Sequence, residues 1–142
     1  MSSARMQSAG FTLVELMIAV AILAIVAAVA LPLYNQYSQR TYRAEAQADL
    51  LNCAQGLERY AAQNFSYDGA ALADACAPRS VDQGRYVFNL DIPDDDQFTI
   101  TATPQAGAME DDGFMTYDQA GQRAWDADDS GAIDADENTW EE

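Results

Sequence analysis

The chain has 142 residues, which leaves room for one modest domain beside any membrane segment. It carries 23 acidic residues against 7 arginines, with no lysine and no histidine, so its net charge is -16. These figures exclude a large multidomain enzyme and disfavour nucleic acid as a partner, because phosphate binding requires clustered cations. An acidic surface instead favours solubility, cation binding, or both.

The first predicted element is a long apolar helix near the amino terminus. Residues 16–31 are apolar throughout, and residues 11–33 approach the roughly 20 residues that span a bilayer. A cleaved signal peptide also fits, since Arg5 precedes the stretch and residues 28–30, Ala-Val-Ala, have the small-x-small cleavage pattern. The signal-peptide interpretation leaves the carboxylate of Glu15 unexplained.

Glu15 is the one charged side chain in residues 11–33. A carboxylate inside an apolar span costs about 2 to 3 kcal/mol even on lenient insertion scales, so a retained one is a functional candidate that needs a partner. The alternative is that Glu15 lies close enough to the membrane surface to reach water.

Residues 10–16, Gly-Phe-Thr-Leu-Val-Glu-Leu, resemble the processing site of type IV pilins and the related pseudopilins, with residues 1–10 as a short polar leader. In that family a dedicated prepilin peptidase and methyltransferase cuts after the glycine and usually methylates the new amino terminus. The resemblance implies that Gly10 is the cleavage residue and that Phe11 begins the mature chain. It also implies that Glu15 pairs with the terminal amine of a neighbouring subunit, in the one register that compensates both desolvated charges.

The helix is expected to continue beyond the apolar residues 11–33. Pro32 removes one backbone hydrogen bond and should kink the helix, and a proline at this place matches the family. Residues 34–64 are expected to be amphipathic, because an apolar stripe recurs at spacings of three and four as far as about Asn64. The stripe consists of Tyr37, Thr41, Ala44, Ala48, Leu51, Ala54 or Gln55, Leu57 and Ala61.

Residues 65–142 are expected to form a globular head with a small sheet. Apolar residues alternate with polar ones over residues 86–92 and again over residues 98–102, and the turn at 93–96 joins the two as a hairpin. Shorter strands are predicted at 114–117 and 122–125. The fold class is therefore α+β, with a long helix packed on a small antiparallel sheet, and the resemblance implies a pilin fold of the minor, PilE-like kind.

Cys53 and Cys76 are the two cysteines of the chain. With no histidine and no further cysteine, a zinc site is improbable. If the apolar segment carries the chain across a membrane, both thiols reach an oxidising compartment and a disulfide is expected, which would stabilise the fold by about 3 kcal/mol. Two buried free thiols are the alternative.

Residues 126–137 match the twelve-residue calcium loop of EF-hands. A glycine, Gly131, occupies the sharp turn at loop position 6, and the apolar Ile133 occupies position 8. The expected ligands of a structural Ca²⁺ are Asp126, Asp128, Ser130, the carbonyl of Ala132, Asp134 and Glu137.

A solvated acidic tail is the alternative interpretation of this loop, because the end of the chain is rich in carboxylates. Gly131 and Ile133 are not acidic, and their correct placement favours calcium. Too few residues follow Glu137 for the second helix of an EF-hand pair, so we expect an ion that ties the C-terminal segment to the sheet rather than a sensor.

These observations predict a structural subunit of a type IV pilus, in particular a minor one. Its expected partners are other pilins, the prepilin peptidase and methyltransferase, and the bacterial inner membrane before assembly, with the head in the periplasm and then in an extracellular pilus. Enzyme activity is not expected, because histidine, lysine and a Gly-x-Ser-x-Gly motif are absent. A type II secretion pseudopilin and a membrane-anchored, calcium-dependent binding module that does not polymerise remain as alternatives.

Overall fold

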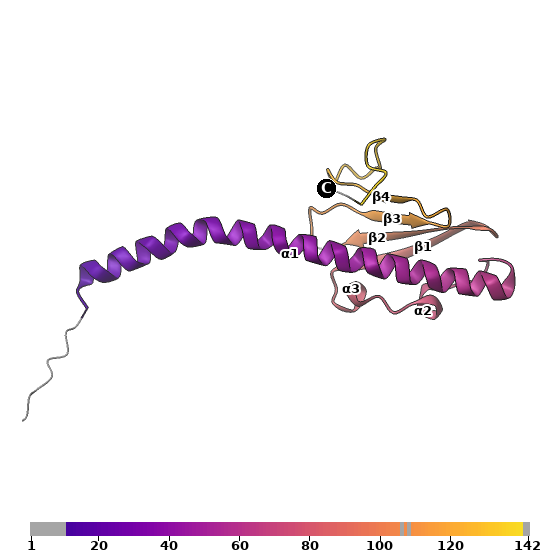
Figure 1. Ribbon diagram of the computed structural model, residues 1–142, viewed down its shortest axis with the longest axis horizontal. Helices are drawn as coiled ribbons and strands as arrows, with labels where there is room; N and C mark the ends of the chain where they lie inside the picture. The colour runs from indigo at the N-terminus through magenta and orange to yellow at the C-terminus, as the bar shows by residue number, and fades with distance from the viewer. Residues whose placement is uncertain (1–10, 106, 108, 141–142) are drawn as a thin grey trace, which may run out of the picture. The chain divides into compact units, whose positions relative to one another are not determined.

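The computed structural model describes residues 11–105, 107 and 109–140, and divides the chain into two compact units, residues 1–36 and 37–142. Three helices and four strands follow one another along the described chain (Figure 1). The helices are α1 (Leu13–Asn64), α2 (Leu72–Ala75) and α3 (Arg79–Asp82), and the strands are β1 (Tyr86–Asp94), β2 (Gln97–Pro104), β3 (Met115–Asp118) and β4 (Arg123–Trp125). The expected α+β class, a long helix with a small antiparallel sheet, is confirmed.

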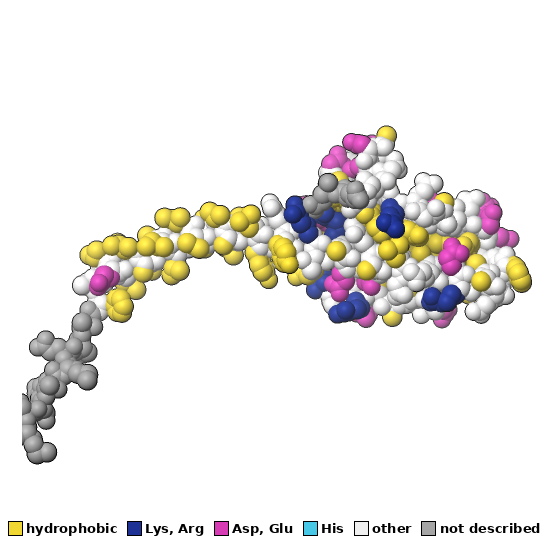
Figure 2. Space-filling model, viewed as in Figure 1, with side chains coloured by type: hydrophobic (Ala, Val, Ile, Leu, Met, Phe, Trp, Pro, Cys, Tyr) yellow, Lys and Arg dark blue, Asp and Glu magenta, His cyan; other side chains and the backbone are white. Residues whose placement is uncertain are grey.

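The first unit contains the apolar part of α1. Every described side chain here is exposed, and Figure 2 shows hydrophobic side chains along the visible face of this stretch. Pro32 lies inside the helix, where it leaves the carbonyl of Ala28 without a helical donor. Among the residues that the structure describes, none covers these apolar side chains.

The second unit is built on an antiparallel sheet of order β1-β2-β3-β4. Leu90 of β1, Ile100 of β2 and Tyr117 of β3 lie in register across the sheet and therefore share one face. This face belongs to the hydrophobic core, and the residues that alternate with it along the strands form the opposite, outer face. The predicted hairpin and both shorter strands are present.

The second part of α1 packs against that core, but mostly through a different face from the predicted stripe. Its buried residues are Arg43, Ala46, Asp49, Leu50, Cys53, Ala54, Gly56 and Leu57. Of the predicted stripe, Ala54 and Leu57 are buried, whereas Tyr37, Thr41, Ala44 and Ala48 are exposed. The prediction was wrong here because the buried face includes two charged residues, which a search for apolar spacing rejects.

Arg43 is buried because it forms an ion pair with Asp112, a residue in the loop between β2 and β3. The guanidinium also lies 3.7 Å from the ring centre of Trp125, whose indole N–H donates to the carbonyl of Asp112 at 2.6 Å. The hydroxyl of Tyr86 donates to the same carboxylate at 2.9 Å. Burial raises the pKa of Tyr86 well above its ordinary value, so this donor keeps its proton.

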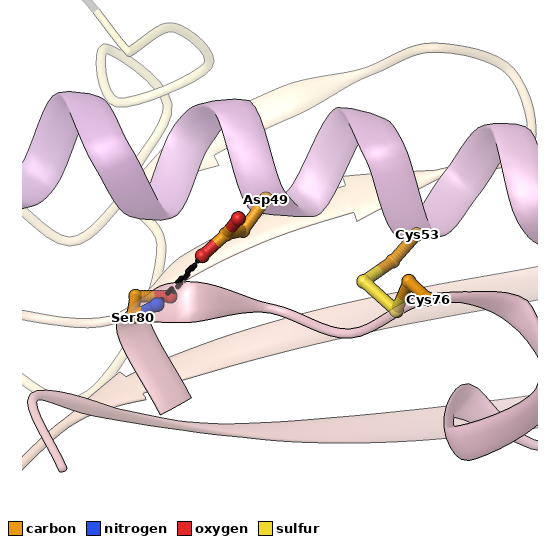
Figure 3. Close-up of a disulfide and its surroundings, with 4 residues drawn as sticks. All are labelled: Asp49, Cys53, Cys76 and Ser80. Carbon is orange, nitrogen blue, oxygen red and sulfur yellow. Dashed lines mark hydrogen bonds between the residues drawn. A yellow bond between two sulfur atoms is a disulfide. The ribbon is translucent and has the colours of Figure 1, made fainter. Parts of the chain in front are cut away.

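Two further links join α1 to the segment that precedes β1 (Figure 3). Cys53 of α1 forms a disulfide with Cys76, in agreement with the expected pairing. One turn earlier, the buried carboxylate of Asp49 accepts hydrogen bonds from the Ser80 backbone N–H at 2.8 Å and from its hydroxyl at 2.6 Å. Arg43, Asp49 and Cys53 lie on one helix face. Through this face α1 is linked both to the β2–β3 loop and to the segment that precedes β1.

Gly56 explains how closely the disulfide-bonded segment approaches α1. A Cβ at this position would overlap the backbone carbonyl of Ala75, the residue before Cys76. The overlap involves backbone rather than a flexible side chain, and the neighbouring disulfide restrains Ala75. A glycine inside a helix, which ordinarily costs about 1 kcal/mol relative to alanine, is therefore required for packing.

We therefore expect Gly56→Ala to lower the free energy of unfolding by about 1 to 3 kcal/mol, although alanine is the better helix former. Thermal or denaturant unfolding of the full chain in detergent measures this change. Asn52→Ala, at an exposed position of the same helix, is the matched control and should change stability by less than about 0.5 kcal/mol. A Gly56→Ala protein more stable than the wild type would contradict the packing argument.

Candidate functional site

The amino-terminal end of α1 holds Glu15 in a reciprocal capping arrangement. The Glu15 carboxylate accepts hydrogen bonds from the backbone N–H and the hydroxyl of Thr12, both at 2.8 Å. In return, the backbone N–H of Glu15 donates to the Thr12 hydroxyl at 3.2 Å. Thr-x-x-Glu is the capping-box pattern, so Glu15 satisfies donors at the start of its own helix.

This capping role was missed when Glu15 was considered only as a charge in an apolar run, although the residue pattern was visible in the sequence. Glu15 is exposed, so its carboxylate remains open to a partner beyond Thr12. The expected cleavage residue, Gly10, lies outside the described residues, and Phe11 is exposed beside Thr12. The end of the helix thus presents one orientated carboxylate next to the expected new terminus.

The apolar part of α1 is the second candidate surface. Among the described residues, α1 is the helix that is long and apolar enough to cross a membrane, with none of its most apolar window buried. Large side chains such as Leu16, Leu23 and Ile25 are more than half exposed. Burying each of them is worth about 1.5 to 3 kcal/mol, so this surface requires lipid or other helices around it.

The third candidate is the acidic loop that follows β4, at residues 126–137. The structure brings Asp126, Asp128 and Glu137 together, with one carboxylate oxygen of each within 4.8 Å of the others. Asp126 is fully buried, whereas the other two are partly or largely exposed. These are three of the six predicted ligands, and their donor set of hard oxygens suits a divalent cation.

Backbone hydrogen bonds orientate the loop carboxylates. Asp126 accepts from the backbone N–H groups of Ser130 and Gly131, both at 2.9 Å. Glu137 accepts from the N–H groups of Ala127 at 2.7 Å and Asp134 at 2.9 Å. Gly131 has a φ of +85°, a conformation that explains why the turn carries glycine. The first and last carboxylates of the loop are therefore fixed by the loop itself.

The other three predicted ligands are placed less directly. The Ser130 hydroxyl donates to the carbonyl of Ala132 at 3.1 Å, so these two expected ligands contact each other. Asp134 is not part of the three-carboxylate group, but it lines the same open hollow as Asp128 and Glu137. The grouped carboxylates of Asp126, Asp128 and Glu137 could hold a metal ion.

Two tryptophans attach the acidic loop to the rest of the second unit. The backbone N–H of Trp125 donates to the carbonyl of Glu137 at 3.1 Å, which closes the loop at its base. Beyond the loop, the indole N–H of Trp140 lies 3.2 Å from the Thr116 carbonyl and 3.1 Å from that of Ala124. Gln47 of α1 donates to the Trp140 carbonyl at 3.4 Å. The loop is thus bracketed by contacts to β3, β4 and α1.

Trp125 also connects this loop to the buried ion pair of α1. Arg43 stacks on its ring, and Asp126 is the next residue along the chain. At the same place, a Cβ on Gly113 would overlap the carbonyl of Asp126, so Asp112 and Gly113 press directly against the start of the loop. Sequence reasoning missed this cluster, because Arg43 and Asp112 carry no motif that pairs residues so far apart.

Comparison with known proteins agrees with the fold. A family model described as "Type IV minor pilin ComP, DNA uptake sequence receptor" matches residues 32–114. A second model, "Prokaryotic N-terminal methylation motif", matches residues 5–31. The two matches together follow the chain from the expected processing site into the loop that contains Asp112.

Fimbrial proteins of two bacteria are similar to this chain. A type IV major fimbrial protein FimA of Dichelobacter nodosus is 41% identical over 115 residues, which are 78% of this chain and 67% of that protein. Another FimA of the same organism is 42% identical over 82 residues, 54% of this chain and 48% of the relative. The fimbrial protein EcpC of Eikenella corrodens is 40% identical over 83 residues, 57% and 52% of the two chains.

The chain spans about half the length of most of the curated relatives it matches. The matched family consists of structural pilins and not of enzymes. The exposed apolar helix, the antiparallel sheet packed on its continuation and these matches lead to one conclusion: the chain belongs to the type IV pilin family.

Proposed function

We propose that this protein is a minor structural subunit of a type IV pilus, processed after Gly10 and assembled through the apolar part of α1. The observation that carries the proposal is an apolar helix exposed along its length, with Glu15 as the one charge near its start. A membrane buries this surface before assembly. In a filament, sister helices bury it through a repeated, non-closing contact between copies.

Glu15 supplies the register of that contact. If cleavage after Gly10 frees the amine of Phe11, each subunit carries one positive terminus and one carboxylate within a single helical turn. Both charges lose water when apolar helices pack, and only a stagger that brings an amine to a neighbour's carboxylate compensates the loss. The hydrogen bonds from Thr12 orientate the Glu15 carboxylate, and the amine of a neighbouring subunit can replace Thr12 as their donor.

A minor rather than a major subunit is supported by the family model that matches residues 32–114, whose description names a minor pilin. The expected partners are therefore other pilins, together with the prepilin peptidase and methyltransferase. The expected location is the bacterial inner membrane, followed by an extracellular pilus.

The same description names a DNA uptake sequence receptor, but we do not extend DNA binding to this chain. Its arginines are few, and several are engaged: Arg43 with Asp112, and Arg85 with Glu45 at 2.5 Å. Arg123 lies 5.1 Å from the ring centre of Trp140. With a net charge of -16, the protein repels a polyanion over most of its surface.

The acidic loop is proposed to bind one structural Ca²⁺. Calcium takes six to eight oxygen ligands, and Asp126, Asp128 and Glu137 are already grouped by backbone hydrogen bonds. The ion would neutralise a carboxylate cluster that otherwise repels itself. Because Trp125 and Trp140 bracket the loop, the ion would fasten the C-terminal segment to the sheet.

We expect Glu15→Ala to abolish incorporation of this protein into filaments while it still accumulates in the membrane, because the variant remains apolar enough to insert but loses its register charge. Shearing followed by sedimentation measures the assembled fraction, which should fall by at least about tenfold.

Thr12→Val is the matched control for this experiment. It removes the hydroxyl that caps the helix, a loss of about 0.5 to 2 kcal/mol, but keeps the Glu15 carboxylate. The control should still assemble. Equal loss of the two variants from the filament fraction would attribute the effect to helix capping and reject the register proposal.

Calcium should raise the melting temperature of the full chain in detergent. At tenfold excess over a dissociation constant of about 0.1 to 1 mM, binding adds about 1.4 kcal/mol, which corresponds to several degrees for a chain of this size. Thermal melting in calcium and in chelator measures the difference, and magnesium controls for simple charge screening.

Glu137→Gln should remove most of the calcium response, since it deletes one grouped carboxylate. Glu110→Gln makes the same chemical change at an exposed position outside the loop and should leave the response intact. A melting temperature of the wild type that does not change with calcium would refute the ion site. So would an equal calcium response of Glu137→Gln and Glu110→Gln.

A further inference from the structure

The outer face of the sheet contains a hollow that none of the functions above uses. Thr99, Thr116 and Ala124 belong to this face, because they alternate with the core residues Ile100, Met115 and Trp125 along β2, β3 and β4. The hollow has a volume of about 230 Å³. Its principal lining residues are Thr99, Thr116, Asp118, Gln122, Ile133 and Asn138.

A second hollow of about 270 Å³ adjoins the first and shares Gln122, Arg123 and Asn138 with it. Small-molecule sites usually have volumes of about 300 to 1,000 Å³, so each hollow has room for one small ring rather than a large cofactor. Because three side chains are common to both, the two hollows can accept adjoining rings of one ligand.

The side chains of the first hollow offer both donors and acceptors. Among the residues that the structure describes, the hydroxyls of Thr99 and Thr116 and the side-chain amide of Gln122 take part in no hydrogen bond. One carboxylate oxygen of Asp118 accepts from the Gln122 backbone N–H at 2.8 Å, which leaves the other for a ligand. Asn138 donates to the Ala135 carbonyl at 2.9 Å and keeps its side-chain oxygen available.

Charge narrows the class of ligand. Asp118 is the one carboxylate that lines the first hollow, too few for a calcium or magnesium ion, which prefers six or more oxygens. Arg123 is its one cation, on a protein whose net charge of -16 disfavours anions. Ile133 and Ala124 supply little apolar surface for an aromatic ligand. A neutral molecule rich in hydroxyl groups matches the remaining donors and acceptors.

A peptide fits this site less well than a sugar. Extended peptides commonly bind by adding a strand at an exposed sheet edge, where backbone groups form the ladder. The hollow instead lies on the face of β2, β3 and β4 and presents side-chain hydroxyls, amides and one carboxylate.

We propose that these adjoining hollows bind a neutral saccharide through two successive rings. Thr99, Thr116 and Asp118 contact one ring, while Gln122 and Asn138, shared by both hollows, lie between the two. Most of the lining belongs to the strands and the β3–β4 turn, while Ile133 and Asn138 come from the acidic loop and the residue that follows it. The site gives the head a binding function in addition to its structural one.

Nuclear magnetic resonance of the full chain tests the site, in a detergent without a sugar headgroup and with about 1 mM calcium. Lactose and cellobiose are the probes, and we expect binding with a dissociation constant of about 1 mM, as suits a shallow polar site. The side-chain amide signals of Gln122 and Asn138 should shift on titration. The signal of Asn89, on the same sheet face but outside both hollows, should not.

The variant Thr99→Val/Thr116→Val removes two hydroxyls and should weaken disaccharide binding by about tenfold. Thr103→Val, on the same strand and face but outside the hollows, is the matched control and should bind as the wild type does. Absence of shifts with both disaccharides, or equal weakening in the two variants, would overturn the proposal. So would shifts at Gln122 and Asn138 that inorganic phosphate or triglycine produces in place of the disaccharides.

Discussion

The apolar surface of residues 13–33 is the constraint on which the rest of this molecule depends. Its large side chains lie exposed, and each would gain about 1.5 to 3 kcal/mol from burial. The described part of the chain does not bury these side chains, and in the proposed function lipid and then sister helices bury them. In the proposed function, the same property places the protein in a membrane first and in a polymer later, and Glu15 selects the packed arrangement that compensates a buried charge.

In the second unit, the continuation of that helix packs against the core and is linked to the segments around it. One face of α1 carries Arg43, Asp49 and Cys53. Arg43 forms an ion pair with the β2–β3 loop, while Asp49 and Cys53 hold the segment before β1 through hydrogen bonds and a disulfide. The disulfide restrains the segment before β1 and leaves the C-terminal residues without a covalent link. A bound ion in the acidic loop would perform that task, which is the physical reason for proposing it there.

Much of this architecture was predictable from periodicity. The end of α1 at Asn64, the hairpin of β1 and β2, and the acidic loop follow from local patterns of apolar, turn and carboxylate residues. The buried face of α1 was not predictable in the same way, because it contains Arg43 and Asp49. Their burial depends on partners that lie 69 and 31 residues away, and no local pattern encodes such a pairing.

The candidate sites also differ in whether local sequence patterns could predict them. Asp126, Asp128 and Glu137 were identified as candidates from the spacing of a calcium-loop motif. Glu15 was identified as the one charge in an apolar run and from the resemblance of residues 10–16 to a pilin processing site. The capping box of Thr12 and Glu15 is also a local sequence pattern, but it was overlooked because Glu15 was considered only as a charge in an apolar run. The saccharide hollow could not be predicted from the sequence. Its lining comes from β2, β3, the β3–β4 turn and the C-terminal segment, which lie together only in the folded protein.

Mass spectrometry of the amino terminus of the protein recovered from membranes and sheared filaments tests the central claim most directly. The account predicts a chain that begins at a methylated Phe11 and retains the whole apolar helix. A mature chain that begins at Leu31, released without its apolar segment, would contradict it, because neither a membrane anchor nor a filament core would remain.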